Sequence, residues 1–540
     1  MALFRSHILI DTGTPAVLNN AIAVKNKLIQ EIKKQGLENE IKVVETGNLG
    51  VQGKSPAIVI YPEGVVYAGV TVADVAELVE EHLLKGRILQ RLVYTGDFAK
   101  VVSAAERARS KEHRVVLKNV GVIDPTSIEE YIAYGGYEGL AKALTQMKPN
   151  QVIDEIKSSM LTGRGGAGFP AGLKWEFTAN SSASPKYVIC NADEGEPGNF
   201  KDRLILEGDP HLIIEALIIA GYAVGAEKGY IYIRGEYHQS VDHTEKAIST
   251  AREMGLLGND IFGSGFNFDI EIFKGAGAYI CGEETALIES MEGRRGEARL
   301  KPPFPPVQGL MGKPTLVNNV ETIANVPNII RLGADWFKSI GTEKSKGTKI
   351  FSPCGDVQYP GVYEVPYGTT LREVIYNLAG GIKSGKKIKG VIMGGPSGKI
   401  VNIDALDSQL CCEDLNPGAG ALIVFDEDKC IVDIMHNIAE FFVHESCGQC
   451  SPCREGNKRI LETIEWWMSG AGKAEDIKML KMLGETMALT SKCGLGQAAT
   501  NTFISSLEYF EDEYLAHLTG AKTCPAGKCR MDDSVLQEVS

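Results

Sequence analysis

Apolar and polar residues follow two different periods along the first 84 residues of the chain. Four short apolar runs have the length and β-branched content of strands, and they occupy residues 7–11, 41–44, 57–61 and 65–68. Apolar positions recur every three or four residues over 18–32 and over 72–84, so we expect a helix in each stretch. The pattern therefore predicts a small α/β unit.

The order of elements in this unit resembles a thioredoxin-like fold, although the unit contains no cysteine. Apolar runs at 186–190, 229–233 and 268–274 alternate with helical stretches, which favours a parallel or mixed sheet covered by helices. The pattern changes over 346–425 and predicts a small β-grasp-like module. From residue 430 to 518 the apolar period is helical throughout, which predicts a helical bundle.

We therefore expect a multidomain α/β protein that ends in helices. Its predicted parts are a thioredoxin-like domain (1–90), a linker (91–115), an α/β domain (116–345), a β-grasp-like module of the SLBB type (346–425), a helical domain (426–520) and a C-terminal tail (521–540).

Composition and charge exclude several classes of function. The 540 residues carry a net charge of −13, which argues against nucleic acid as a partner. The longest apolar stretch, 211–226, contains Glu215 and is too short to span a bilayer. The N-terminus lacks the architecture of a signal peptide. We expect a cytoplasmic protein with no direct membrane span.

The 12 cysteines are unevenly distributed, because nine of them lie from Cys411 onward. In a large chain without a secretory signal, such clustering indicates metal binding rather than a disulfide framework. Cys447, Cys450 and Cys453 are each separated by two residues, and three thiolates at this spacing can bind three corners of a 4Fe-4S cluster. Cys493 lies among small residues and is the candidate for the fourth ligand. A structural zinc site or ordinary buried thiols are the alternatives.

The loop at 163–170 has the composition of a phosphate-binding loop. Four glycines within six residues expose backbone N–H groups, while Arg164 and Lys174 supply positive charge. Phe169 and Phe177 offer faces on which flat rings can stack. The loop matches neither G-x-G-x-x-G nor the P-loop pattern, so a tight structural turn is the alternative.

Three further loops contain polar groups suited to a nucleotide or a flavin. The loop at 191–198 follows a predicted strand and carries three carboxylates for hydroxyl or amide donors, with a solvated turn as the alternative. The loop at 275–285 is rich in glycine and opens a helix. The proline-rich segment 301–306 is stiff and leads to amide and hydroxyl side chains at 318–322. Together, the four loops upstream of a cysteine cluster favour ligand binding.

These motifs, at 163–177, 191–203, 275–285, 299–322 and 445–454, resemble those of the flavin-carrying NADH dehydrogenase subunit of respiratory complex I. They are equally similar to the matching subunits of soluble NAD-linked hydrogenases and formate dehydrogenases. The resemblance covers roughly residues 110–520. The additional N-terminal domain resembles the hydrogenase branch, in particular the beta subunit of soluble multimeric iron–iron hydrogenases.

The resemblance implies a set of ligand contacts. For FMN it implies Gly163, Arg164, Gly165, Lys174, Asn191, Asp193, Glu194, Gly282, Glu283, Asn318, Asn319 and Thr322. For NAD(H) it implies Phe169, Phe177, Glu196, Tyr279, Glu284 and Lys301. For the 4Fe-4S cluster it implies Cys447, Cys450, Cys453 and Cys493.

The resemblance also implies hydride transfer from NADH to FMN, without a catalytic side chain, and electron transfer from FMN through the cluster to partner subunits. The implied partners are a thioredoxin-like 2Fe-2S subunit and a larger catalytic subunit, with an iron–iron hydrogenase favoured over a formate dehydrogenase. Relatives often hold a 2Fe-2S cluster in the N-terminal domain, but 11–14 and 46–52 contain no cysteine here. The chain also stops eleven residues after Cys529, so we expect no ferredoxin-like domain of the kind that many relatives carry.

Two other functions compete with this interpretation. One is electron bifurcation with ferredoxin, and the other is a degenerate, non-enzymatic scaffold. Near the C-terminus, His517, Cys524 and Cys529 together with Cys430 form a weak zinc-like pattern. Ordinary reduced thiols are the alternative to zinc there.

Overall fold

The computed structural model describes residues 4–12, 14–46, 49, 51, 54–94, 110–519 and 523–529. The chain divides into two compact units: Met1–Ser110 with Gly121–Ser127, and Lys111–Val120 with Ile128–Ser540. The predicted linker and C-terminal tail lie largely outside the described residues, as do parts of the segments 11–14 and 46–52.

The first unit is built on a four-stranded sheet of order β2-β1-β3-β4. Its strands are β1 (Ser6–Asp11), β2 (Ile41–Thr46), β3 (Ala57–Tyr61) and β4 (Val65–Ala68). β1 is parallel to β2 and antiparallel to β3, which is antiparallel to β4. Its helical segments are α1 (Thr14–Leu18), α2 (Ala21–Lys34), η1 (Val72–Asp74), α3 (Val75–Leu78), η2 (Val79–Leu84) and η3 (Gln90–Leu92). The four predicted strands and both predicted helices are therefore present.

The α/β part of the second unit contains a parallel sheet of order β7-β6-β5-β8. Its strands are β5 (Tyr187–Ala192), β6 (Lys228–Arg234), β7 (Asp269–Gly275) and β8 (Thr315–Asn319). Its helices are α5 (Ile128–Ala133), α6 (Glu138–Gln146), α7 (Pro149–Ser158), α8 (Ala171–Asn180), α9 (Lys201–Gly208), α10 (Pro210–Val224), α11 (His238–Glu253), α12 (Glu284–Met291), α13 (Val320–Ala324), α14 (Val326–Leu332) and α15 (Ala334–Lys338). The apolar α10 is almost completely buried and contacts β5 and β6. The sequence pattern missed β8, because the proline-rich segment before it obscures a strand of five residues.

The next part is a mixed sheet of order β10-β9-β13-β11-β12. Its strands are β9 (Thr348–Gly355), β10 (Tyr363–Pro366), β11 (Ile388–Met393), β12 (Lys399–Asn402) and β13 (Ala421–Asp426). β9 and β13 are parallel, and the other neighbours are antiparallel. A helical turn, η7 (Glu373–Leu378), lies between β10 and β11. The buried Glu364 carboxylate accepts backbone hydrogen bonds from Val115, Val116 and Leu117, which packs the start of this unit against β10.

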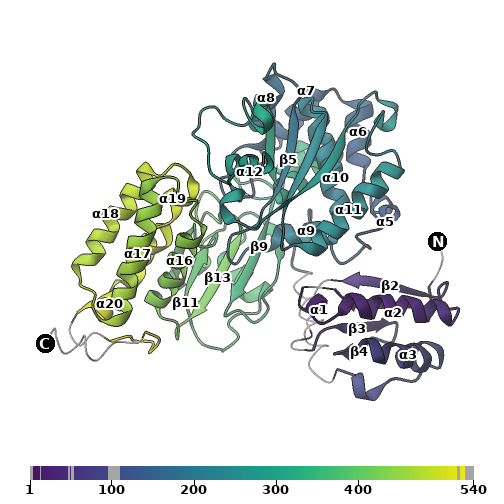
Figure 1. Ribbon diagram of the computed structural model, residues 1–540, viewed down its shortest axis with the longest axis horizontal. Helices are drawn as coiled ribbons and strands as arrows, with labels where there is room; N and C mark the ends of the chain where they lie inside the picture. The colour runs from purple at the N-terminus through teal and green to yellow at the C-terminus, as the bar shows by residue number, and fades with distance from the viewer. Residues whose placement is uncertain are drawn as a thin grey trace. The chain divides into compact units, whose positions relative to one another are not determined.

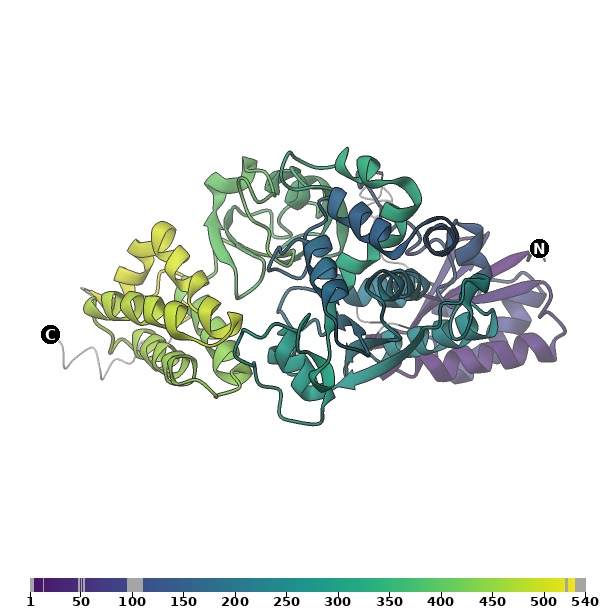
Figure 2. The ribbon, with the colours of Figure 1, turned by 90° about the horizontal axis from the view of Figure 1, so that it is seen from above.

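Helices form the C-terminal part of this unit, as the sequence predicted. They are α16 (Ile431–Glu445), α17 (Ser451–Ser469), α18 (Glu475–Thr490), α19 (Gly494–Ala498) and α20 (Asn501–Leu518), and they gather into one bundle (Figures 1 and 2). One hydrophobic core runs from Ile189 in β5 through Phe425 in β13 to Trp467 in α17. The three parts of the unit therefore share one packed interior.

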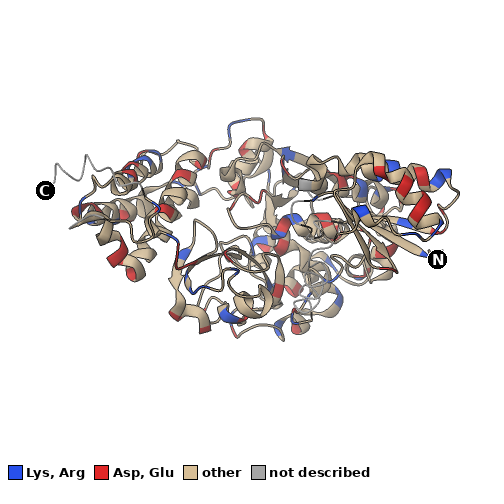
Figure 3. Cartoon of the chain, turned by 90° about the horizontal axis from the view of Figure 1, so that it is seen from below, with Lys and Arg blue, Asp and Glu red and all other residues tan. Residues whose placement is uncertain are grey.

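Acidic and basic residues are interspersed along the chain (Figure 3). The sequence contains 56 Lys and Arg residues and 69 Asp and Glu residues. Within the described ranges, α10 and the other helices are too short or too polar to cross a bilayer.

Candidate functional site

A cavity of about 720 Å³ opens at the carboxyl ends of the parallel strands. Asn191 at the end of β5 is paired with Asn319 at the end of β8, and this edge of an open α/β sheet is where ligands bind. Nine of the residues predicted for FMN or NADH line the cavity: Gly165, Asn191, Asp193, Glu194, Glu196, Tyr279, Gly282, Glu283 and Asn319. The fold thus brings residues from all four predicted loop segments to one place.

Asp193 is the most unusual group in the cavity wall. Both of its carboxylate oxygens are buried, and neither has a hydrogen-bond partner among the described residues. Burial raises the pKa of this carboxyl to about 7, while Arg234 acts to lower it and Glu236 and Glu445 act to raise it. A buried acceptor without a donor is costly, so this position is built to receive donors from a ligand.

Three other predicted side chains in the cavity are already held by hydrogen bonds within the protein. The Glu194 carboxylate accepts the backbone N–H groups of Asp202 and Arg203 at 3.0 and 3.1 Å and so supports the start of α9. Asn319 donates to Asp202 at 2.6 Å. Asn191 donates to the backbone oxygen of Gly282 at 2.9 Å, which fixes two cavity loops against each other.

The charge of Arg164 does not face the cavity, contrary to the expectation from the sequence. Its guanidinium is fully buried, donates to Thr162 and to the backbone oxygen of Lys346, and stacks on the Tyr367 ring at 4.7 Å. Its backbone N–H donates to Thr322 Oγ1 at 2.7 Å. Arg164 and Thr322 therefore fix the glycine loop through contacts within the protein.

Lys174 belongs to a chain of ion pairs beside the cavity. Its ammonium lies 3.0 Å from Glu284 Oε2, and the Lys301 ammonium lies 2.9 Å from Glu284 Oε1 and 2.7 Å from Glu283. Burial acts to raise the pKa of Glu284, but the two lysines outweigh it and lower the pKa below its ordinary value. The side chain therefore stays charged. Among these four residues only Glu283 lines the cavity itself.

The remaining predicted residues, Gly163, Asn318, Phe169 and Phe177, do not line the cavity. Gly163 donates its N–H to the backbone oxygen of Phe169 at 2.9 Å, which closes the loop. Asn318 accepts from the Trp175 indole at 2.9 Å and is buried. Phe169 and Phe177 are 45% and 51% exposed, so both rings are accessible to a ligand.

Glu196 and Tyr279 are in direct contact in the cavity wall. The Tyr279 hydroxyl donates to Glu196 Oε2 at 2.5 Å. The sequence pattern did not indicate a third partner, Ser397, which donates to Glu196 Oε1. It also did not indicate Gly394 and Ala419 in the cavity wall, although the glycine-rich runs 394–398 and 418–420 were a readable signal.

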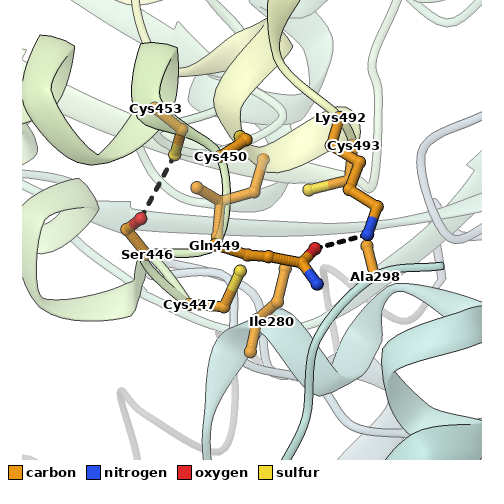
Figure 4. A pocket seen from close by; sticks show the side chains of 10 residues that line it. Ile280, Ala298, Ser446, Cys447, Gln449, Cys450, Cys453, Lys492 and Cys493 are labelled. Atoms are coloured by element: carbon orange, nitrogen blue, oxygen red, sulfur yellow. Dashed lines mark hydrogen bonds between the residues drawn. The ribbon is translucent and has the colours of Figure 1, made fainter. Parts of the chain in front are cut away.

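The four predicted cluster cysteines surround one small space. Cys447, Cys450, Cys453 and Cys493 all line the same pocket, and the sulfur atoms of Cys447, Cys453 and Cys493 point into it (Figure 4). Cys450 caps α17 and Cys493 caps α19, so backbone N–H groups at helix starts lie near the sulfurs. Asn457 Nδ2 donates to Cys453 Sγ at 3.3 Å. The donor set and its hydrogen bonds fit a 4Fe-4S cluster.

The cavity and the pocket lined by the cluster cysteines share two lining residues, Ile280 and Leu495. Ile280 lies in the glycine-rich loop at 275–285, and Leu495 lies in α19, two residues after Cys493. The two spaces therefore adjoin each other at these side chains. The arrangement can therefore pass electrons from a group in the cavity to a group held by the cysteines.

A second group of metal-binding side chains lies at the end of α20. The ligand atoms of Cys430, His517, Cys524 and Cys529 all lie within 4.8 Å of one another. Cys430 Sγ is 3.5 Å from His517 Nε2 and 3.6 Å from Cys529 Sγ. His517 Nδ1 lies 2.8 Å from the backbone oxygen of Glu513, which leaves Nε2 as the ligand atom.

Known proteins show which family shares this arrangement. Residues 156–328 match the Nuo51 FMN-binding domain, 433–517 the NADH-ubiquinone oxidoreductase-F iron-sulfur binding region and 354–401 the SLBB domain. The NADP-reducing hydrogenase subunit HndC of Solidesulfovibrio fructosivorans is 51% identical over 431 residues, which are 79% of this chain and 87% of that protein. The chain belongs to the family of FMN- and NADH-binding subunits of NADH-quinone oxidoreductases and their hydrogenase counterparts.

Two further relatives agree with membership of this family. An F-type NADH-quinone oxidoreductase subunit from Rhizobium meliloti (strain 1021) is 46% identical over 76% of this chain and 99% of its own. A chain in the crystal structure of an NAD+-reducing [NiFe]-hydrogenase in the H2-reduced state matches with a TM-score of 0.67 and 31% identity, over 97% of this chain and 86% of that one.

Membership of the family confirms the main predictions from the sequence. The protein is an oxidoreductase subunit that binds FMN and NADH and carries a 4Fe-4S cluster for electron transfer to partners. The roles of individual residues remain predictions, to which the geometry of the site adds support.

Proposed function

We propose that this subunit exchanges electrons between NADH and a partner of a soluble NAD-dependent iron–iron hydrogenase. The observation that supports this path most directly is the shared wall of Ile280 and Leu495 between cavity and cysteine pocket. When bound, FMN accepts a hydride as an electron pair and releases electrons singly, which is the conversion that a cluster requires. The protein's task is to place and surround the two groups.

Asp193 and the cavity loops would hold the FMN. The unpartnered oxygens of Asp193 suit hydroxyl or amide donors, and the backbone of Gly165 and Gly166 can approach a phosphate closely. Gly282 lies against Asp193, where a Cβ would come within 3.3 Å of the Asp193 backbone oxygen. Glu194 and Asn319 fix the edges of the site through Asp202.

NADH would lie over the flavin, with its flat rings against Phe169 and Phe177 and its hydroxyl groups near Glu196. The carboxylate of Glu196, which lines the cavity, would repel the additional 2′-phosphate of NADPH, so we infer a preference for NADH. The test is kcat/KM for both nucleotides. Glu196→Gln should narrow the difference in kcat/KM between NADH and NADPH, and an unchanged difference would reject this basis for the preference.

The relatives supply the argument for the partners. HndC is by its description a hydrogenase subunit, and the structural relative belongs to an NAD+-reducing [NiFe]-hydrogenase. We infer a thioredoxin-like 2Fe-2S subunit and a larger catalytic subunit, which we take to be an iron–iron hydrogenase in the cytoplasm. The first unit has the strand order of a thioredoxin-like domain but no cysteine before Cys190, so it would act in docking rather than in electron transfer. An NAD-dependent formate dehydrogenase and a ferredoxin-dependent bifurcating complex are the alternatives.

The experiment is purification of the complex from its native cells. Flavin absorbance, NADH-dependent dye reduction and hydrogen-dependent NAD+ reduction are expected, with iron but no nickel in the large subunit. Formate-dependent reduction would favour the first alternative, and a requirement for ferredoxin would favour the second. Protein that folds normally but contains neither flavin nor iron would overturn the proposal.

We also propose that Cys430, His517, Cys524 and Cys529 bind a structural zinc ion. Three thiolates and one imidazole are a common zinc donor set, and the separations of 3.5 and 3.6 Å at Cys430 are close to those across a tetrahedral site. The site would join the start of α16 to the end of α20 and hold residues 524–529 against both. Zinc content of the purified protein is the measurement that tests it.

A further inference from the structure

We propose that the turn at 394–398, in the SLBB-type module, is part of the nucleotide site and that Ser397 positions the carboxylate of Glu196. This inference rests on the proposed function, since it concerns how NADH is bound. The turn connects β11 to β12, and its residues Gly394, Ser397 and Gly398 line the same cavity as the flavin loops.

Ser397 contacts Glu196 through two donors. Its backbone N–H and its hydroxyl both donate to Glu196 Oε1 at 2.9 Å, while Tyr279 occupies Oε2. A carboxylate offers about four lone-pair sites, and three are used here. The remaining site lies on a carboxylate whose rotation is blocked from both sides. Glu196 is therefore prepared to accept one hydrogen bond in one direction, which is the requirement for binding a ribose hydroxyl.

The turn fits against Glu196 without spare room. Gly395 has φ +84°, and a Cβ at this position would lie 2.4 Å from Cγ of Glu196. The backbone of the turn thus packs directly on the side chain. A larger residue would have to push the carboxylate toward the cavity, so glycine is needed both for the conformation and for the contact.

Two residues at the start of α20 hold the backbone of the turn. Asn501 Nδ2 donates to the backbone oxygen of Ser397 at 3.0 Å, and the Thr502 hydroxyl donates to that of Pro396 at 2.5 Å. Both residues begin α20, which follows directly on α19 and its capping residue Cys493. Ser397 therefore stands between the nucleotide carboxylate and the helices that carry the cluster, and it is a positioning residue because it acts through Glu196.

The test compares Ser397→Ala and Ser397→Thr in the full chain. We measure KM and kcat for NADH-dependent dye reduction and the flavin content of each protein. Ser397→Ala should raise KM for NADH about 3- to 10-fold, in line with the loss of one hydrogen bond to a charged group while the backbone donor remains. It should change kcat less than about 2-fold, and Ser397→Thr, which keeps the hydroxyl, should restore KM.

Ser384→Ala is the matched control. Ser384 lies in the same module and its hydroxyl also donates to a carboxylate, that of Asp426 at 2.9 Å, but neither residue lines the cavity. This variant should leave KM unchanged. An unchanged KM in Ser397→Ala, or an equal rise in both alanine variants, would overturn the proposal.

A double-mutant cycle with Glu196→Gln separates positioning from a general structural effect. If Ser397 acts through Glu196, Ser397→Ala should raise KM less than about 2-fold further in the Glu196→Gln protein. Additive effects would reject the role of Ser397. Failure of the proposed function would look different, because the unmodified protein would then lack flavin or NADH activity altogether.

Discussion

The backbone N–H of Tyr279 donates to the carboxylate of Glu445 at 2.8 Å. Tyr279 begins the turn that carries Ile280 and Gly282, and Glu445 is the last residue of α16, two positions before Cys447. One hydrogen bond thus joins the wall of the flavin cavity to the segment that presents the cluster cysteines.

Replacing Glu445 by alanine should slow electron transfer from flavin to cluster. Loss of a hydrogen bond to a charged group costs about 1.5–3 kcal/mol and would free the turn that holds Ile280 against the cysteine pocket. We expect NADH-dependent reduction of a dye that takes electrons from flavin to change less than about 2-fold, since hydride transfer does not use this contact. Reduction of the cluster, followed by rapid-freeze EPR, should become slower.

Glu440→Ala is the control for this experiment, since Glu440 is exposed on the same helix. It should leave both rates unchanged. Equal rates of cluster reduction in Glu445→Ala and in the unmodified protein would show that the hydrogen bond has no part in the transfer.

Asp193→Asn should weaken FMN binding but stabilise the flavin-free protein at neutral pH. The folded-state pKa of about 7 lies above the ordinary value of 3.8, so the flavin-free folded protein binds this proton more tightly than the unfolded chain. Its free energy of unfolding therefore falls as pH rises from about 4 to about 7. Asparagine cannot bind this proton, so the variant should lack this dependence of stability on pH. The loss of a charged acceptor should also lower the affinity for FMN about 10-fold or more.

Thermal unfolding with and without FMN, at several pH values, measures both effects. The flavin-free Asp193→Asn protein should have the higher Tm at pH 8 and gain less from added FMN. If the unmodified flavin-free protein shows the same pH dependence as the variant, Asp193 is not the group responsible.

The sequence predicted the strands and helices better than it predicted the directions of side chains. The apolar run predicted at 186–190 covers most of β5, and the helical period predicted from 430 onward includes α16. The spacing from Cys447 to Cys453 is typical of a 4Fe-4S cluster. Arg164 is a residue whose side-chain direction could not be predicted from the sequence. A positive charge in a glycine loop suggests a phosphate contact, but the Arg164 guanidinium instead contacts Tyr367, which is 203 residues away. Such a contact depends on the tertiary fold, and the local sequence does not contain it.

Phe169 and Phe177 should contribute to NADH affinity through stacking. Each ring is about half exposed, and stacking of a base on an aromatic side chain contributes about 1–3 kcal/mol. Phe169→Ala and Phe177→Ala should each raise KM for NADH about 5- to 100-fold, and leucine should restore little because it lacks a π face. Phe262→Ala is the control, since Phe262 is 44% exposed but lies in η4 (Ile261–Gly263), away from the predicted loops. Equal KM values in all three alanine variants would exclude stacking on these rings.

Zinc analysis tests the second metal site, and the thiols permit a matched pair of variants. Cys524 belongs to the four-residue group at the end of α20, whereas Cys412 is an exposed thiol outside it.

The unmodified protein should contain about one zinc and about four iron atoms per chain. Cys524→Ser should lose the zinc and keep the iron, because the cluster cysteines are a separate set. The released tail should then be cut faster by protease, since the metal would add to the packing that holds residues 524–529 against α16 and α20. Cys412→Ser should leave both metals and the rate of cleavage unchanged. A folded protein with full iron content but without zinc would reject the site.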